Sequence, residues 1–219
     1  SEAALSSDFA FGRGAVRAAL ARLQAAGFVS SSARSGWRVT PVSAREIREV
    51  TAARRQLEPL LCSVPLSPGD RTNLHRLAEM QMALMQRHDL GHNSLTTIRR
   101  CERDMLDTLA ARLNMPIVSG WLSDLWDRSM RLVNFFEASS SEKLVPASRW
   151  HFVEALLDGR RADALSQLAG ANAALEAYLL DRFLQSEAMV AAPPSAHPAE
   201  KKRQVHPTRK ATPNIRTAR

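Results

Sequence analysis

The sequence predicts a mainly α-helical protein. We expect a winged helix-turn-helix head with a small β hairpin, followed by an all-α helical bundle. Three observations support this. The composition is rich in Leu and Ala, with 45% hydrophobic but only 5% aromatic residues, which favours helix over strand. Two short helical patterns and two short β-like runs occupy the first 43 residues. Apolar residues then recur at helical spacing throughout residues 44–186.

The head, residues 1–43, contains two predicted helices. The first runs from Ser1 and Glu2 to about Phe9, and the second from about Gly14 to Ala26. Gly27 suits the left-handed position just after a helix end. The runs "FVSSS" and "GWRVTPV" predict two strands around a turn at residues 33–36. Helix, tight turn, helix and hairpin together make a winged helix-turn-helix.

The body, residues 44–186, is expected to form roughly six helices. Ser43 followed by Glu46 has the spacing of a capping box at the start of the first of them. Pro116 is placed to begin a later one. Short predicted loops favour antiparallel packing of neighbours into a bundle.

Charge is concentrated at the two ends of the 219-residue chain, whose net charge is +8. Residues 1–45 carry a net charge of +4, residues 46–186 of −1 and residues 187–219 of +5. The last segment is rich in proline and lacks apolar periodicity, so we expect a disordered basic tail. Basic ends suggest a polyanionic partner, although a tail that is merely solvated stays open.

No apolar run is long enough to cross a bilayer, and no signal-peptide pattern is present. The two cysteines, Cys62 and Cys101, have no metal or redox spacing, which is typical of buried thiols in a reducing compartment. We therefore expect a cytoplasmic protein with no membrane partner.

Arginines on the second predicted helix suggest contact with DNA. The N-terminal residues of a recognition helix read the major groove, which indicates Arg13, Gly14 and Arg17. Arg22 lies further along and is expected to face solvent, and Trp37 is interpreted as a packing residue. The predicted wing tip can reach phosphate or the minor groove and consists of Arg34, Ser35 and Gly36. A simple solvated face is the alternative.

The stretch "SEAALSSDFAFGRGAVRAALARLQAAGFVSSSARSGWRV" resembles, without a gap, the winged helix-turn-helix of GntR-type bacterial regulators. The stretches "REIREVTAARRQLEP", "LAARLNMP" and "EALLDGRRADAL" resemble the FCD ligand-binding domain of the FadR-like subgroup. The resemblance implies a homodimer on palindromic double-stranded DNA and a small-molecule effector. The positions that match the head pattern are Leu5, Arg13, Val16, Arg17, Leu20, Leu23, Gly27, Val29, Gly36 and Val39.

This chain departs from the resemblance in the head. The family's opening helix precedes the segment where this sequence starts, so we expect an N-terminally incomplete head. The family's "SRTP" is "GRGA" here, which replaces a hydroxyl by Gly14 and a helix-starting proline by Ala15.

A second departure concerns metal binding. Many FCD domains hold a metal through an Asp, a His four residues later and two further His. The matching positions here are Glu102, Leu106, Arg149 and a position near Ala171, with His151 two residues from the third. Because too few ligands remain, we expect neither a metal nor another cofactor.

Arg149 would place a cation inside the bundle, where it needs an acidic partner. Glu102 can supply it internally, or the carboxylate of a small organic acid can supply it as an effector. The predicted effector site consists of Glu102, Leu106, Arg149 and His151. Arg99 and Arg100 are expected at the surface.

These observations predict a ligand-responsive transcription regulator that controls metabolic genes and is not an enzyme. One alternative is a helical metabolite-binding protein that has lost specific DNA binding. A second alternative is an enzyme that uses Glu102 and His151 as acid and base. It is disfavoured because no nucleophile–base pair or phosphate loop is evident. A third is nonspecific nucleic-acid binding by the tail.

Overall fold

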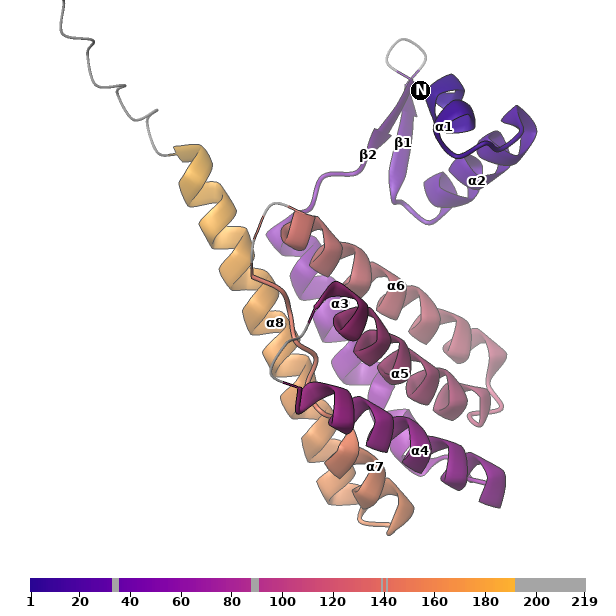
Figure 1. Cartoon of the computed structure of the whole chain (residues 1–219), viewed down its shortest axis with the longest axis vertical. Helices are drawn as coiled ribbons and strands as arrows, with labels where there is room; N and C mark the ends of the chain where they lie inside the picture. The colour runs from indigo at the N-terminus through magenta and orange to yellow at the C-terminus, as the bar shows by residue number, and fades with distance from the viewer. Residues whose placement is uncertain (33–35, 88–90, 139, 141, 192–219) are drawn as a thin grey trace, which may run out of the picture.

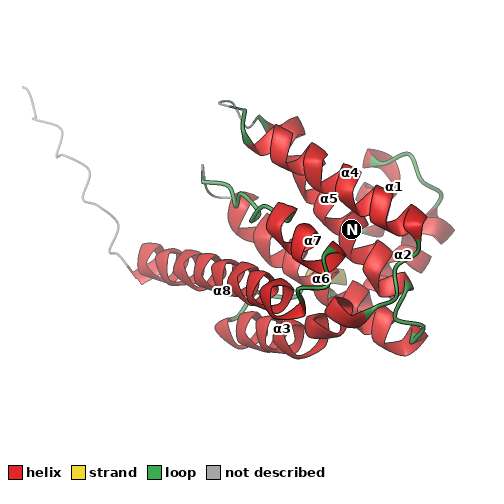
Figure 2. Cartoon of the chain, turned by 90° about the horizontal axis from the view of Figure 1, so that it is seen from below, coloured by secondary structure: helices red, strands yellow, loops and turns green. Residues whose placement is uncertain are grey.

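The computed structural model describes residues 1–32, 36–87, 91–138, 140 and 142–191. Within them the chain is mainly helical, and a two-stranded antiparallel hairpin is the only sheet (Figures 1 and 2). The head lies at one end of a bundle of longer helices (Figure 1). The predicted fold class is confirmed.

The head consists of α1 (Glu2–Asp8), α2 (Arg13–Ala25), β1 (Val29–Ser32) and β2 (Gly36–Val39). Gly27 ends α2 with φ of +78°, as its position predicted. Its N–H donates to the carbonyl of Gln24, and the N–H of Phe28 donates to that of Leu23, each at 2.9 Å. This pair of bonds is a Schellman motif, which turns the chain sharply from α2 into β1.

The head has a thin core of its own. Val16 and Leu20 of α2 are buried, but Leu23, which matches the apolar pattern, is 40% exposed. Three more large apolar side chains of the head are over 60% exposed: Phe9, Phe11 and Val39. The described part of the head therefore exposes apolar side chains as well as the arginines of α2.

The bundle contains six α-helices and one 3₁₀ helix, in agreement with the prediction. They are α3 (Ala44–Leu57), η1 (Glu58–Ser63), α4 (Pro68–Met85), α5 (His92–Ala111), α6 (Pro116–Ala138), α7 (Trp150–Leu157) and α8 (Arg161–Ala191). One apolar core lies among η1, α4, α5, the first half of α6, α7 and the first half of α8. A second joins α3 to α6 and the later part of α8.

Three local expectations need correction. Ser43 caps α3, but the Glu46 carboxylate accepts from Arg131 at 2.8 Å, while the complete capping box is at Ser67 and Asp70. The interval between the end of α6 at Ala138 and the start of α7 at Trp150 is longer than the short loops expected. The long α8 continues to Ala191, so residues 187–191 are helical, and the rest of the predicted tail lies outside the described residues. None of the helices that the structure describes could cross a membrane.

Candidate functional site

The first candidate site is the exposed part of α2. Arg13, Gly14 and Arg17 are exposed, whereas Val16 and Leu20 on the same helix are buried. A Cβ added at Gly14 would meet nothing within 4 Å, so the backbone there is open to a partner. Arg22 is exposed as expected, and the helical geometry turns it about 140° around the axis from Arg17.

Glu2 at the start of α1 connects this face to the hairpin. Its Oε2 accepts from Arg17 Nε at 3.3 Å and from Nη2 at 3.1 Å, and its Oε1 accepts from the Trp37 indole N–H at 3.1 Å. These bonds from Trp37 and Arg17 lower the pKa of Glu2, so it stays ionised. Trp37 is half-buried, as a packing residue should be, but its indole N–H also has a specific partner, Glu2, which no sequence pattern predicted.

The hairpin next to α2 is the candidate wing. Its register pairs Val29 with Val39 and Ser32 with Gly36. Gly36 has φ of +71°, a conformation that favours glycine, and it starts β2. The predicted contact residues Arg34 and Ser35 lie outside the described residues.

Two arginines of α6 join the head to the bundle. The guanidinium carbons of Arg128 and Arg131 lie 5.2 and 5.8 Å from the ring centroid of Phe28, in cation–π geometry. Arg128 also donates to the carbonyl of Ala26 at 2.5 Å, and Arg131 donates to that of Thr40. These contacts hold the end of α2 and the exit of β2, so α6 directly supports the candidate DNA-contacting unit.

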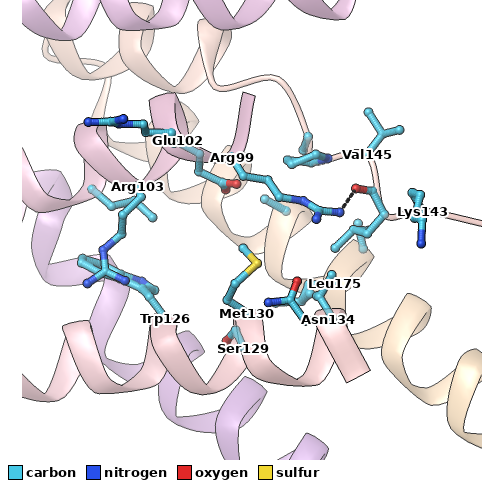
Figure 3. A pocket seen from close by; sticks show the side chains of 18 of the residues that line it. Arg99, Glu102, Arg103, Trp126, Ser129, Met130, Asn134, Lys143, Val145 and Leu175 are labelled. Atoms are coloured by element: carbon cyan, nitrogen blue, oxygen red, sulfur yellow. Dashed lines mark hydrogen bonds between the residues drawn. The ribbon is translucent and has the colours of Figure 1, made fainter. Parts of the chain in front are cut away.

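The second candidate site is a cavity of about 620 Å³ inside the bundle. Arg99, Glu102 and Arg103 of α5 face Trp126, Met130 and Asn134 of α6 across it, and residues 143–149 close one side (Figure 3). Glu102, Leu106, Arg149 and Ala171 all line this cavity. The four positions matched to the metal ligands of FCD domains are thus brought together.

His151 is not part of this group. It lies on α7 with its side chain 72% exposed, and its Nδ1 is 3.3 Å from Glu154 Oε2. It borders a separate small depression rather than the cavity. The structure does not bring it to Glu102, Leu106 and Arg149, because α7 turns this side chain outward. The described residues contain no group of three or more His, Cys, Asp or Glu side chains able to hold a metal ion.

Arg149 is buried, and Glu102 supplies its partner internally. Its Nε donates to Glu102 Oε1 at 2.9 Å, and its Nη2 donates to the same oxygen. Burial opposes the charge, but the nearby carboxylates of Glu102 and Glu58 outweigh it and raise the pKa of Arg149. Arg149 Nη1 is buried, and this one nitrogen of the guanidinium has no hydrogen-bond partner within the described structure.

Arg99 and Arg54 repeat this arrangement. Arg99, expected at the surface, is only 14% exposed and forms a two-bond ion pair with Glu137, at 2.5 and 3.0 Å. Arg54 donates to Glu58 at 2.8 Å inside the bundle. The Arg54–Glu58 spacing of four was readable from the sequence. The Arg99–Glu137 pair joins α5 to α6, and no local pattern reveals it.

The buried charges in the cavity wall are consequently paired, Arg54 with Glu58, Arg99 with Glu137 and Arg149 with Glu102. Each of its buried arginines already has a carboxylate, so an entering molecule need not be an anion to satisfy them. Among the described residues that line the cavity, the buried donors without a partner are Arg149 Nη1 and Arg99 Nε. The rest of the wall is largely apolar, with Leu106, Met130, Val133 and Leu175 among its residues. This arrangement suits a small molecule with an apolar body and a hydrogen-bond acceptor.

Comparison with known proteins finds no matching family model and no matching curated protein. Solved structures do match. Escherichia coli McbR/YncC has a TM-score of 0.64 at 21% identity, over 84% of this chain and 86% of its own. A GntR-family transcriptional regulator of Pseudomonas syringae pv. tomato has a TM-score of 0.52 at 19% identity, over 88% and 79% of the two chains.

Lar of Listeria monocytogenes, which controls expression of the agr system, also has a TM-score of 0.52, at 16% identity over 83% of this chain and 86% of its own. At these identities the likeness establishes the fold. The chain shares the winged-helix and helical-bundle architecture of structures that include GntR-family regulators.

Proposed function

We propose that this chain is a ligand-responsive transcription regulator whose head, residues 1–43, binds double-stranded DNA. The observation that carries the proposal is the exposed part of α2, where Arg13, Gly14 and Arg17 stand beside the buried Val16 and Leu20. A helix of this kind enters the major groove with its N-terminal residues toward the bases. Arginine pairs there with guanine O6 and N7, or with phosphate.

The hairpin serves as the wing in this proposal. It follows α2 directly, through the Schellman turn at Gly27, so its tip can reach the backbone next to the groove that α2 occupies. Arg34, Ser35 and Gly36 supply these contacts. A second copy, dimerised through the helical body, places a second α2 about one DNA turn away on a palindromic operator.

The helical body, residues 44–186, holds the effector in the cavity lined by Glu102, Leu106 and Arg149. A small organic acid fits its chemistry, because a carboxylate oxygen accepts the unpartnered N–H groups of Arg149 and Arg99. No metal is needed for this contact. Binding favours one arrangement of the bundle and so changes DNA affinity and the expression of metabolic genes.

A helical metabolite-binding protein without specific DNA binding is the second candidate. This candidate is favoured by the exposed apolar side chains of the head, Phe9, Phe11, Leu23 and Val39. A head with so small a core holds its helix and hairpin less firmly in the arrangement that DNA binding requires. The cavity would then be the whole functional site.

Selection of bound sequences from random duplex DNA at physiological salt tests the proposal. The full chain is compared with a chain that ends at Ala191, after α8. A palindromic motif enriched by both forms supports a dimeric regulator that reads DNA through its head. If no motif is enriched, or binding disappears with the tail, the head is not the DNA-reading unit and the proposal fails.

A further inference from the structure

We propose that Glu2 is a positioning residue that sets Arg17 to read a base edge in the major groove. The inference rests on the proposed DNA-binding function and extends it to a residue that itself meets no DNA. Three elements converge on its carboxylate: α1 supplies Glu2, α2 supplies Arg17 and β2 supplies Trp37.

The geometry leaves one end of the guanidinium available. Glu2 Oε2 takes the Nε and Nη2 N–H groups at 3.3 and 3.1 Å, along the side of the Arg17 fork. The two parallel N–H bonds at the far end, one from each terminal nitrogen, match the spacing of guanine O6 and N7. The Arg17 side chain is 72% exposed, so this far end is accessible.

Pairing with Glu2 also changes what Arg17 contributes. An isolated arginine is attracted to every phosphate of DNA and adds to nonspecific affinity. Because Glu2 neutralises Arg17 and holds its planar group in one orientation, the general attraction falls while the geometric requirement remains. Arg17 then contributes more to discrimination between bases than to nonspecific affinity for DNA.

The bond from Trp37 ties the wing to the same carboxylate. Trp37 pairs with Ser31 across the hairpin, so Glu2 Oε1 is linked through it to both strands. The pKa of Glu2 is lowered by these partners, which keeps the carboxylate charged at neutral pH. Glu2 thus links the recognition helix to the wing, beside the direct bond from Gln24 of α2 to Ser31 of β1.

The test uses the full chain and the sequence that wild type enriches from random duplex DNA. In Glu2→Gln the amide oxygen still accepts from Trp37, but the charge that holds Arg17 is lost. We expect discrimination at the base pair read by Arg17 to fall about tenfold, as for loss of one good base contact. Binding to unrelated DNA should tighten, and its dependence on salt should steepen by about one ion.

Glu49→Gln is the matched control. Glu49 pairs with Arg45 on the exposed surface of α3, so the change in net charge is the same and Arg17 is untouched. Glu2→Asp adds a second test that keeps the charge but shortens the reach. It should relax base preference without tightening binding to unrelated DNA. Circular dichroism confirms that each variant is folded before binding is measured.

Equal behaviour of Glu2→Gln and Glu49→Gln would overturn the inference, because net charge alone would then explain the effect. Unchanged base preference in both Glu2 variants would also overturn it, while leaving the proposed function intact. A wild-type chain that enriches no sequence contradicts the proposed function itself, and the inference falls with it.

Discussion

The guanidinium of Arg128 lies 5.2 Å from the ring centroid of Phe28, and this contact joins the helical bundle to the end of α2. Arg128 belongs to α6, the helix that also contributes Trp126, Met130 and Asn134 to the cavity wall. One rigid helix therefore contacts both candidate sites. A shift of α6 on effector binding would reach the head through Arg128 without any change inside the head.

Arg128→Ala should loosen the attachment of the head. A cation–π contact contributes about 0.5–1 kcal/mol and the bond to the Ala26 carbonyl about 1 kcal/mol. Cleavage by a protease in the connection at residues 40–43 should become about tenfold faster, because it follows the population of the undocked state. Urea unfolding of the bundle should change little. Arg45→Ala, on the exposed surface of α3, is the control, and equal cleavage rates in the two variants would contradict the role of Arg128.

Arg17→Ala should weaken binding to the selected DNA by about 1–3 kcal/mol and relax the base preference at one position. Arg22→Ala is the matched control, since Arg22 is an exposed arginine of the same helix that projects in another direction. Gel-shift titration at fixed salt measures both. Similar losses in the two variants would mean that α2 contributes only general positive charge.

The sequence predicted those parts of the fold that depend on neighbouring residues. Gly27 ends α2 and Ser43 begins α3 because each acts within a few residues of itself. The Arg99–Glu137 pair escaped prediction because its partners are 38 positions apart on different helices. From the sequence alone, Arg99 fits a solvent-exposed face of α5 equally well, and only the packing of α6 against α5 shows that it is buried.

The residues predicted for the cavity show the same division. Glu102 and Leu106 share a face because they are four residues apart on α5. Arg149 was assigned to the same site by the resemblance to the metal ligands of FCD domains, and it lines the same cavity. His151 lies outside the cavity because it comes two residues after Arg149, the N-cap of α7, and two helical residues turn a side chain by about 160°. The sequence left open whether Glu102 or an entering carboxylate partners Arg149, and in the folded chain Glu102 does so.

Asp70 gives the protein a pH dependence with a definite sign. Its Oδ2 accepts from the Ser67 hydroxyl at 2.6 Å and from the Ser67 N–H at 2.9 Å, and its Oδ1 accepts from Arg112 at 2.8 Å. Bonds from Ser67 and Arg112 lower the pKa of Asp70 from 3.8 to about 2. Because the folded-state pKa is the lower one, this stabilisation is present above pH 3.8 and is lost as the pH falls toward 2.

Asp70→Asn should therefore reduce the free energy of unfolding at neutral pH and flatten its fall between about pH 4 and pH 2. Urea titrations across this range measure both effects. Asp158→Asn provides a control, since Asp158 is largely exposed and pairs only with the exposed Arg160. A wild-type-like acid transition in Asp70→Asn would show that other carboxylates govern it.

The Glu102–Arg149 pair offers the most direct test of the cavity's chemistry. Glu102→Ala leaves the buried Arg149 without its carboxylate, which should lower the free energy of unfolding by about 3 kcal/mol. The same change opens space for a small acid beside an unpaired guanidinium. Propionate should then raise the melting temperature of this variant more than that of wild type, because it binds the folded state at the position Glu102 has left. Glu79→Ala, at an exposed site on α4, is the control for general salt effects. If propionate does not stabilise Glu102→Ala, the cavity does not admit a carboxylate at Arg149, and the proposed class of effector is wrong.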